Sequence, residues 1–354
     1  MPASHHHGFS CALPRRTLLA WLTASALMPA SAALAAQGAK AATKATAPVE
    51  APAASVLTTR VNALNTTPLL AQGARGDAVL RAQILMDRAW FSTGEIDGVF
   101  GTNMRRIVSA FQTSKDFKPT GKIDTLTWQA LTGDAPEAVL ETYTLTDQDV
   151  AGPFSPTPED TMAKAKLKSL DYETVEEALG EKFHCSVKWL KNANPGSRFE
   201  AGDALTVPSL DTDAALPQVS SIRIDKSERV LFLLDKAGKP VAAFPMSMGG
   251  VSDPLAVGSM TIKNAAKDPV FTFDPALLKG TKADDVKADL PAGPNSPVGV
   301  YWLGLSKPHW GIHGTPSPAR VGRSESNGCI HLTNWDVQRV ARVVKVGFEV
   351  MVNA

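Results

Sequence analysis

Hydrophobic residues recur every three or four positions in the first half of the chain, which is the spacing of an amphipathic helix. One such pattern covers residues 79–85 and a second covers 104–111. An Asp-Gly dipeptide between them predicts a turn. A further helix is expected to begin near Asp124 or Thr125. These patterns predict a small helical domain over residues 58–135.

The next segment, residues 136–212, mixes helical and extended patterns. Residues 175–183 present one helical face, and residues 187–195 lead into an Asn-Pro turn. A Gly-Asp turn and a short strand ending at Pro208 follow. A proline-rich stretch precedes these elements, so the segment does not form one regular pattern.

Strand patterns replace helical ones from residue 218 onwards. The first three strands are separated by polar turns, as in a β-meander. The predicted strands are 222–224, 230–234, 241–248, 258–262, 298–303 and 348–352. One helix is expected over 335–344, with Thr333 or Asn334 as its cap. We therefore predict a multidomain α+β chain whose last domain, 218–354, is a mostly-β sandwich.

The N-terminus has the layout of an export signal. Arg15 and Arg16 precede an apolar run over 18–28, and an Ala-Leu-Ala cleavage site follows at 33–35. The apolar run is too short for a comfortable membrane span. We expect a signal peptide over 1–35, by the general secretory or the twin-arginine route, and no transmembrane segment in the mature chain. The expected location is the periplasm or the cell wall.

The composition of the chain argues against some classes of binding partner and some kinds of cysteine site. Residues 36–57 are mostly Ala, Thr, Lys and Pro, which predicts a flexible linker. Lys and Arg number 36 against 35 Asp and Glu, so the chain lacks the basic surplus of a nucleic-acid binder. Three cysteines are too few for a disulfide scaffold or a four-cysteine zinc site. No cofactor is expected.

Two short runs in the last domain carry candidate chemistry, residues 309–315 and 324–332. Cys329 is accompanied by histidines, which makes it a candidate nucleophile in an exported chain. Only a thiolate attacks a carbonyl, so the cysteine needs a neighbour that takes its proton. Gly328 leaves room for a substrate, and the backbone N–H groups of 327–329 are candidate oxyanion donors.

Other interpretations compete for the same residues. A metal site at His309, His313, Cys329 and His331 is one alternative, although the spacing matches no familiar zinc pattern. Four further choices stay open. His309 and Trp310 are either groove-lining or packing residues or catalytic ones, and His331 is either a second base or a buried histidine. Arg320 and Arg323 are either ligands of a carboxylate or solvated residues, and Cys185 is either a small buried residue or a disulfide partner of Cys329.

The helical domain resembles the three-helix peptidoglycan-binding domain of wall hydrolases. The matching residues are Gly76-Asp77, Val79, Gln83, Leu85, Gly94, Ile96-Asp97-Gly98, Phe100-Gly101, Ala110-Phe111-Gln112, Gly121 and Thr127-Trp128. Residues 136–212 resemble the second half of a LysM module, while the first half fits poorly. Glycan binding and a plain structural spacer both stay open for this segment.

The last domain resembles the L,D-transpeptidase (YkuD-type) catalytic domain over about 219–354. Ile312-His313-Gly314-Thr315 matches one family motif, and Ser326-Asn327-Gly328-Cys329-Ile330 matches the other. A Pro- and Gly-rich run over 290–299 matches the approach to the site. Two residues depart from the family, since Asn327 replaces the usual His and His331 replaces the usual Arg or Asn.

The resemblance implies a role for each matched residue. Cys329 would be the nucleophile, His313 the general base, and the Gly314 carbonyl the group that orients this base. Asn327 and Gly328 would donate to the oxyanion. The expected substrate-binding residues are Ser326, His331, Trp310 and Arg323.

The implied substrate is a peptidoglycan stem peptide, cut between an L-centre residue and the terminal D-alanine. An acyl-enzyme would then be resolved by an amine from a second stem peptide or from a wall-linked protein. The expected partners are therefore stem peptides and glycan strands. Two alternatives stay open, a hydrolase that uses the same cysteine and a non-catalytic wall-binding protein.

Overall fold

The computed structural model describes residues 55–65, 69–133, 138–210, 217–250, 254–278, 280–326 and 328–354. The expected signal peptide and nearly all of the expected linker lie outside these residues. Ser55 caps helix α1 (Val56–Asn62), so this helix begins within the range expected for the linker. No helix in the described ranges is long and apolar enough to cross a membrane.

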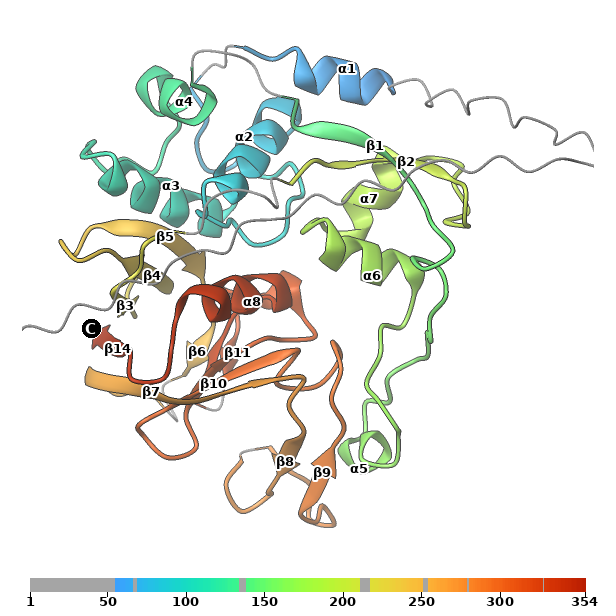
Figure 1. The fold of residues 1–354 in the computed structure, drawn as a ribbon, viewed down its shortest axis with the longest axis vertical. Helices are drawn as coiled ribbons and strands as arrows, with labels where there is room; N and C mark the ends of the chain where they lie inside the picture. Colours follow the sequence, from blue (N-terminus) through green and yellow to red (C-terminus); the bar gives the residue numbers. More distant parts are fainter. Residues whose placement is uncertain are drawn as a thin grey trace, which may run out of the picture. The chain divides into compact units, whose positions relative to one another are not determined.

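Three helices form the domain predicted from the first helical patterns, α2 (Asp77–Arg88), α3 (Thr102–Ser114) and α4 (Thr125–Thr132) (Figure 1). Two buried glutamines fix the turns between them. Gln83 accepts hydrogen bonds from the backbone N–H groups of Asp97 and Gly98, and Gln112 accepts one from Gly121. A buried amide that pairs with turn backbone satisfies groups that would otherwise lose their water.

The middle segment is a two-stranded antiparallel sheet with three helices between its strands in the sequence. β1 (Leu140–Thr144) pairs with β2 (Ala204–Pro208). α6 (Val175–Lys182) and α7 (Val187–Ala193) begin at capping side chains of Thr174 and Ser186. The short helix α5 (Thr161–Lys164) lies in the long connection between β1 and α6. Glycan binding by this segment stays a prediction.

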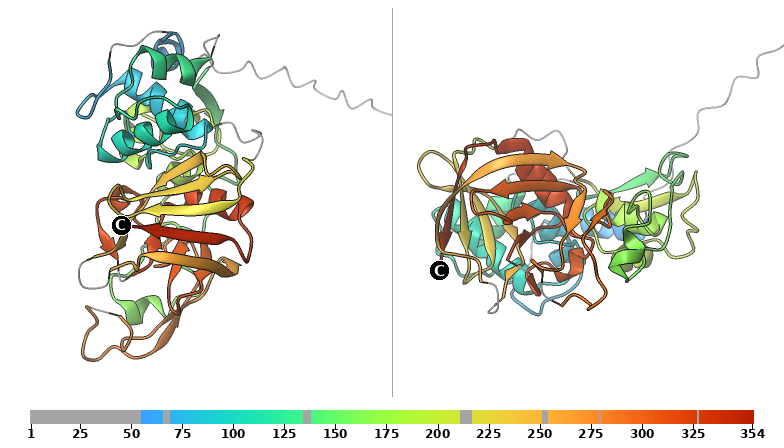
Figure 2. Two further views of the ribbon diagram at one scale, coloured as in Figure 1. Left: turned by 90° about the vertical axis from the view of Figure 1, so that its left-hand side faces the viewer. Right: turned by 90° about the horizontal axis from the view of Figure 1, so that it is seen from below.

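The last domain contains one eight-stranded sheet in the order β13-β11-β10-β7-β14-β3-β4-β5 (Figure 2). In sequence order these strands are β3 (Ser221–Asp225), β4 (Val230–Leu234), β5 (Pro240–Pro245), β7 (Gly258–Lys267), β10 (Tyr301–Leu305), β11 (Gly311–His313), β13 (Ile330–His331) and β14 (Glu349–Asn353). The mostly-β fold predicted for the last domain is therefore confirmed.

The predicted sandwich has two layers, and the long strand β7 takes part in both of them, so a single sheet forms the two layers. Its first half, 258–261, pairs with β14, and its second half, 262–267, pairs with β10. The sheet therefore curls at β7 and encloses a core that includes Ile224, Leu233 and Ile312. Helix α8 (Asn334–Val343) adds Val337 and Val340 to this core.

Short elements complete the domain. They are the paired strands β6 (Met248–Gly249) and β12 (Glu325–Ser326), the paired strands β8 (Phe271–Phe273) and β9 (Ala288–Leu290), and the 3-10 helix η1 (Pro318–Arg320). None of these short elements was predicted from the sequence.

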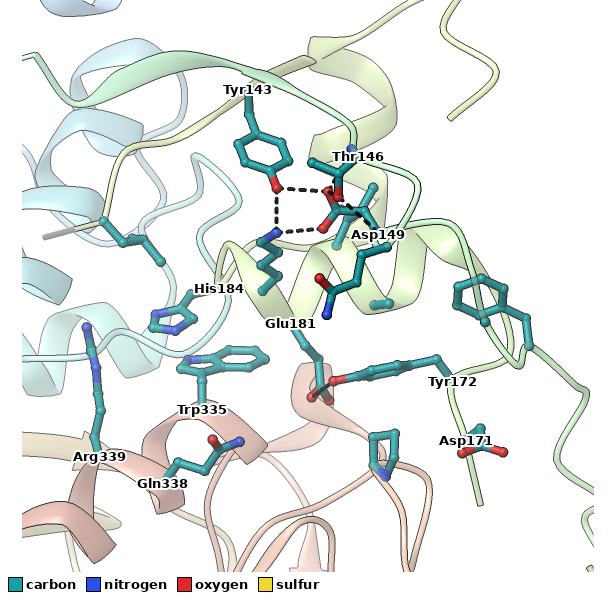
Figure 3. Close-up of a pocket in the computed structure, with 18 of the residues that line it drawn as sticks. Tyr143, Thr146, Asp149, Asp171, Tyr172, Glu181, His184, Trp335, Gln338 and Arg339 are labelled. Carbon is teal, nitrogen blue, oxygen red and sulfur yellow. Dashed lines mark hydrogen bonds and ion pairs between the residues drawn. The ribbon is translucent and has the colours of Figure 1, made fainter. Parts of the chain in front are cut away.

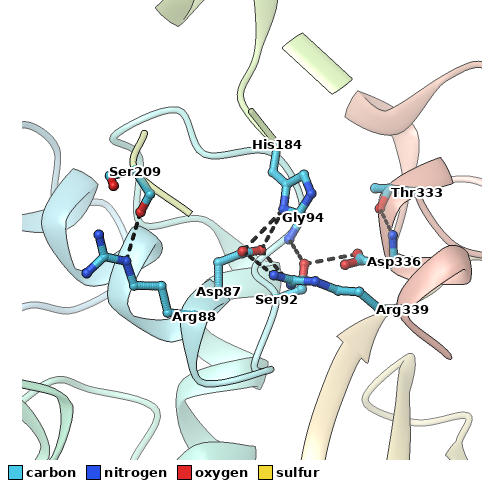
Figure 4. Close-up of polar contacts among 9 residues, drawn as sticks. All are labelled: Asp87, Arg88, Ser92, Gly94, His184, Ser209, Thr333, Asp336 and Arg339. Atoms are coloured by element: carbon cyan, nitrogen blue, oxygen red, sulfur yellow. Dashed lines mark hydrogen bonds and ion pairs between the residues drawn. The ribbon is translucent and has the colours of Figure 1, made fainter. Parts of the chain in front are cut away.

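A buried charge network joins the helical domain, the middle segment and α8 (Figure 4). The carboxylate of Asp87 on α2 accepts two hydrogen bonds from Arg339 at 2.7 and 2.9 Å and lies 3.2 Å from His184 Nδ1. Burial by itself would raise the pKa of Asp87, but the charges of Arg339 and His184 outweigh it and hold this pKa well below its usual value. Ser92 donates to the neighbouring carboxylate of Asp336 at 2.9 Å. The three parts therefore share polar contacts as well as apolar ones.

Candidate active site

Three aromatic rings form a row across neighbouring strands of the curled sheet. β11 pairs with β10 so that His313 lies opposite Trp302, and with β13 so that His313 lies opposite His331. Paired residues share one face of a sheet. Trp302 accordingly stacks on His313 with ring centroids 5.3 Å apart, and His331 lies 4.4 Å from His313 on the other side. Ile312 and Ile330 point the opposite way, into the core.

His313 is 3% exposed and is held in one tautomer. Its Nδ1 lies 2.7 Å from the carbonyl oxygen of Gly314. A carbonyl only accepts hydrogen bonds, so Nδ1 must carry the hydrogen and Nε2 keeps its lone pair. Burial, with a smaller contribution from His331, holds the pKa of His313 well below its ordinary value. His313 is therefore a neutral base at neutral pH.

His331 is the second titratable group of the row. Burial lowers its pKa to about 4, so it too is neutral at neutral pH. Its backbone forms two hydrogen bonds with Ser247, at 2.9 and 3.0 Å. The ring contact with His313 and this backbone anchoring fix the position of His331 beside the candidate base.

Cys329 comes directly before β13, two residues before His331. Ile330 between them is buried in the core, whereas Cys329 and His331 are half-buried, and His331 lies opposite His313 in the paired strands. The Sγ atom of Cys329 lies 3.5 Å from the carbonyl oxygen of His309. The structure therefore places Cys329 directly before the strand that pairs with the strand of His313, and their roles as nucleophile and base stay predictions.

The residues before Cys329 are described in part. Gly328 has φ +96°, a conformation that favours glycine, and it is buried. Ser326 belongs to β12, and Asn327 lies outside the described residues. The predicted oxyanion and substrate roles of these three residues stay predictions.

Position 314 has room only for glycine, because the side chain of Asn334 packs directly against it. The sequence predicts Asn334 only as a possible helix cap. A Cβ atom at Gly314 would lie 2.2 Å from Asn334 Oδ1, and one at Gly299 would lie 2.1 Å from the same atom. Asn334 is fully buried, accepts from Val300 N and donates to the Pro294 carbonyl. This amide therefore packs directly behind the residue whose carbonyl holds His313.

Two further residues, missed in the sequence, hold the loop that leads to Cys329. Ser247 is 1% exposed, and its hydroxyl accepts from Gly322 N at 3.1 Å. Asn103 on α3 donates to the Val321 carbonyl at 2.9 Å. Neither residue has a sequence signal of its own, because each contacts a partner more than seventy positions away.

Trp310 and Arg323 were predicted to bind substrate. Trp310 is 8% exposed within the core, and the ammonium of Lys307 lies 3.4 Å from its ring centroid, which favours the packing alternative. Arg323 is exposed, and its guanidinium would lie 3.7 Å from a Cβ atom at Gly101 of the helical domain. Its predicted role stays open.

The described residues also bear on the metal and disulfide alternatives. Within the described residues, no group of three or more His, Cys, Asp or Glu side chains is placed to hold a metal ion. Cys185 and Cys329 do not form a disulfide with each other. Cys185 is buried, and burial raises the pKa of its thiol. Of the two alternatives for Cys185, the structure therefore agrees with a small buried residue and not with a disulfide partner of Cys329.

Two family models match this chain. Residues 220–352 match the L,D-transpeptidase catalytic domain of the YkuD family, and residues 75–131 match the "Putative peptidoglycan binding domain". The two matches leave out residues 136–212, so the LysM-like interpretation is not confirmed.

Similar proteins carry L,D-transpeptidase names. "Putative L,D-transpeptidase YkuD" of Bacillus subtilis is 29% identical over 173 residues, which cover 48% of this chain and 88% of that protein. "Probable L,D-transpeptidase YbiS" of Escherichia coli is 25% identical over 195 residues, covering 54% of this chain and 61% of that protein. An L,D-transpeptidase structure from Xylanimonas cellulosilytica aligns with TM-score 0.35 and 13% identity, covering 82% of this chain and all of that one.

Proposed function

We propose that this chain, which carries an L,D-transpeptidase catalytic domain and a peptidoglycan-binding domain, cross-links peptidoglycan through a cysteine acyl-enzyme. The expected bond is the one between an L-centre residue of a stem peptide and its terminal D-alanine. The observation that supports the proposal is the neutral, tautomer-fixed His313, whose strand pairs with the strand that begins directly after Cys329. A base in this state is ready to take a thiol proton.

The first half of the reaction forms a thioester. His313 Nε2 takes the proton of Cys329, and the thiolate adds to the stem-peptide carbonyl. The tetrahedral intermediate collapses, the C–N bond breaks, and His313 returns the proton to the departing amine of D-alanine. The carbonyl of Gly314 accepts from Nδ1–H throughout, and it stabilises the imidazolium that forms in between.

The second half transfers the acyl group. An acceptor amine loses a proton to His313 and attacks the thioester, and Cys329 departs as a thiolate that recovers the proton. The acceptor is proposed to be an amine of a second stem peptide or of a wall-linked protein. Water in the same place would make the chain a hydrolase.

Burial of the row keeps His313 neutral and able to accept a proton, while the same burial disfavours the imidazolium, which the Gly314 carbonyl offsets in part. Trp302 covers one face of His313, and both histidines are neutral, so no fixed positive charge opposes imidazolium formation. A positive His331 would do so. Backbone N–H groups at Gly328 and Cys329 are proposed as donors to the oxyanion, with Asn327 as an additional donor.

The remaining parts of the chain suit work on a wall. The peptidoglycan-binding domain would hold the enzyme on its polymeric substrate and raise the local concentration of stem peptides. Export to the periplasm or cell wall follows from the signal expected at residues 1–35.

Incubation of the purified protein with tetrapeptide stems tests the proposal. Mass spectrometry is expected to find cross-linked dimers and free D-alanine, both absent with Cys329→Ala. D-alanine release without dimers would indicate transfer to water. No release from a folded protein would refute the proposed activity.

A further inference from the structure

A cavity of about 870 Å³ lies between the middle segment and the catalytic domain (Figure 3). Its walls come from β1 and the connection after it, from α6, and from the outer side of α8. The volume is within the range of small-molecule sites. We propose that this cavity is a binding site for a short, uncharged segment of a glycan chain.

The cavity is separate from the candidate active site. Helix α8 contributes Trp335, Gln338 and Arg339 to the cavity, while its Val337 and Val340 pack in the core against the sheet that carries His313. None of the three rings in the row lines the cavity. A ligand there would therefore lie behind α8 and would leave the catalytic face open.

Aromatic side chains from different elements border the cavity. Tyr143 comes from β1, Tyr172 from the connection after β1, and Trp335 from α8 (Figure 3). Phe154, from the same connection, also lines the cavity. Tyr143, Phe154 and Tyr172 are half-buried, so their rings remain partly accessible. Amphipathic rings of this kind offer apolar faces for the C–H surfaces of sugars together with polar edges.

Three charged groups of the cavity wall, Asp149, Lys182 and Arg339, are already paired, and the buried Glu181 accepts hydrogen bonds from the neutral side chains of Asn334 and Tyr172. Asp149 accepts from Lys182 Nζ at 2.6 Å and from the Tyr143 hydroxyl at 2.8 Å. Arg339 is bound by Asp87, as Figure 4 shows. Binding a strongly charged ligand would disrupt these pairs, so the wall favours an uncharged one.

Uncharged hydrogen-bonding groups complete the wall. Gln148 and Gln338 present exposed amides, each with donors and acceptors that match sugar hydroxyls. Trp335 is 5% exposed, and its Nε1–H has no hydrogen-bond partner among the described residues. A hydroxyl-rich ligand supplies the acceptor that such a donor needs. Aromatic faces, paired charges and free amides together point to a saccharide.

The source of the saccharide rests on the proposed function. A chain with a peptidoglycan-binding domain meets glycan strands of amino sugars, and a second contact with the same strand would strengthen attachment. The cavity would then hold sugar units while the stem peptide reaches Cys329 on the other side of α8.

Calorimetric titration of the full chain with a tetramer of β-1,4-linked N-acetylglucosamine tests the site. The key variant is Gln338→Trp, which places a bulky ring in the cavity from an exposed position. Lys345→Trp is the control, because Lys345 is also exposed, follows α8 and does not line the cavity. Affinity is expected to fall about tenfold or more in Gln338→Trp and to stay within about twofold in Lys345→Trp.

Acylation of Cys329 by a carbapenem, followed by intact mass, separates this inference from the proposed function. Both tryptophan variants are expected to acylate like wild type. Absence of tetramer binding, or binding that Gln338→Trp leaves unchanged, would overturn the saccharide site. Failure of wild type to acylate at Cys329 while tetramer binding follows the expected pattern would instead count against the proposed function and leave the site supported.

Discussion

Asn103 Nδ2 donates to the Val321 carbonyl oxygen at 2.9 Å, and this bond ties the peptidoglycan-binding domain to the loop that ends at Cys329. Asn103 is 9% exposed. Gly322, the next residue, has φ +76°, and a Cβ atom there would lie 2.2 Å from Asn103 Oδ1. Arg106 adds a 3.4 Å contact to the Gly322 carbonyl. Helix α3, within the residues that match the peptidoglycan-binding domain, is thus part of the support of the candidate active site.

Asn103→Ala is expected to slow carbapenem acylation several-fold while wall binding is retained. Loss of one buried hydrogen bond costs about 1 kcal/mol of unfolding free energy, so the protein should still fold. Thr113→Ala, an exposed change on the same helix, is the control. Stopped-flow fluorescence gives the acylation rate. An unchanged rate in Asn103→Ala would show that the loop needs no support from α3.

Cys329→Ala is expected to abolish D-alanine release and leave binding to isolated walls intact. The nucleophile lies in the catalytic domain, whereas the family match for wall binding covers residues 75–131. A pull-down on sacculi and a D-alanine assay measure the two properties. Release near the wild-type level would contradict the assignment of the nucleophile.

Gly314→Ala is expected to reduce acylation strongly and to destabilise the fold by about 1–3 kcal/mol, because the new methyl group meets the buried Asn334. Gly101→Ala is the control, since the nearest atom to its Cβ would be 3.7 Å away and its backbone is extended. Thermal unfolding and acylation kinetics measure both effects. Activity equal to wild type in Gly314→Ala would refute the role of this close packing.

The acid limb of the acylation rate is expected below pH 6.5. The pKa of His313 is depressed, so the protonated, inactive form accumulates only when the pH falls below that lowered value. A histidine with an ordinary pKa would lose roughly two-thirds of its neutral form between pH 7 and 6. A pH series of carbapenem acylation checks this, and a midpoint at or above pH 6.5 would contradict it. His331→Asn removes the smaller of the two effects that lower the pKa of His313, so the midpoint of the acid limb should rise slightly in this variant.

The final prediction concerns Asn327, where relatives of the catalytic family usually have His. An amide offers a neutral donor, so we expect Asn327 to assist the oxyanion without moving a proton. Asn327→Ala should slow acylation on the order of a hundredfold, and Asn327→His should be tolerated. Rapid-mixing kinetics on both variants would decide. Wild-type acylation in a folded Asn327→Ala protein would limit this residue to a role in the turn.

Much of the fold follows from local patterns. Helices α2 and α3 and strands β3, β4 and β5 lie where the hydrophobic pattern predicts them, because the helices and β3 bury one face while β4 and β5 are continuous apolar runs buried on nearly every position. Cys329 and His313 were identified by motif, since their neighbours Gly328 and Gly314 satisfy steric needs that only glycine meets.

The supports of the site depend on the tertiary structure. β11 and β13 have three and two residues, too few to show a period, and they become strands only by pairing across the loop between them. The contact of Asn103 with Val321 spans 218 positions, and the cavity beside α8 combines distant segments. The sequence by itself determined the regular elements, which follow from short-range spacing, and it identified the candidate reactive residues through short motifs that resemble those of a known family. Only the folded chain decided the lowered pKa of His313, the anchoring of the loop and the cavity, because these arise from packing between residues that are remote in sequence.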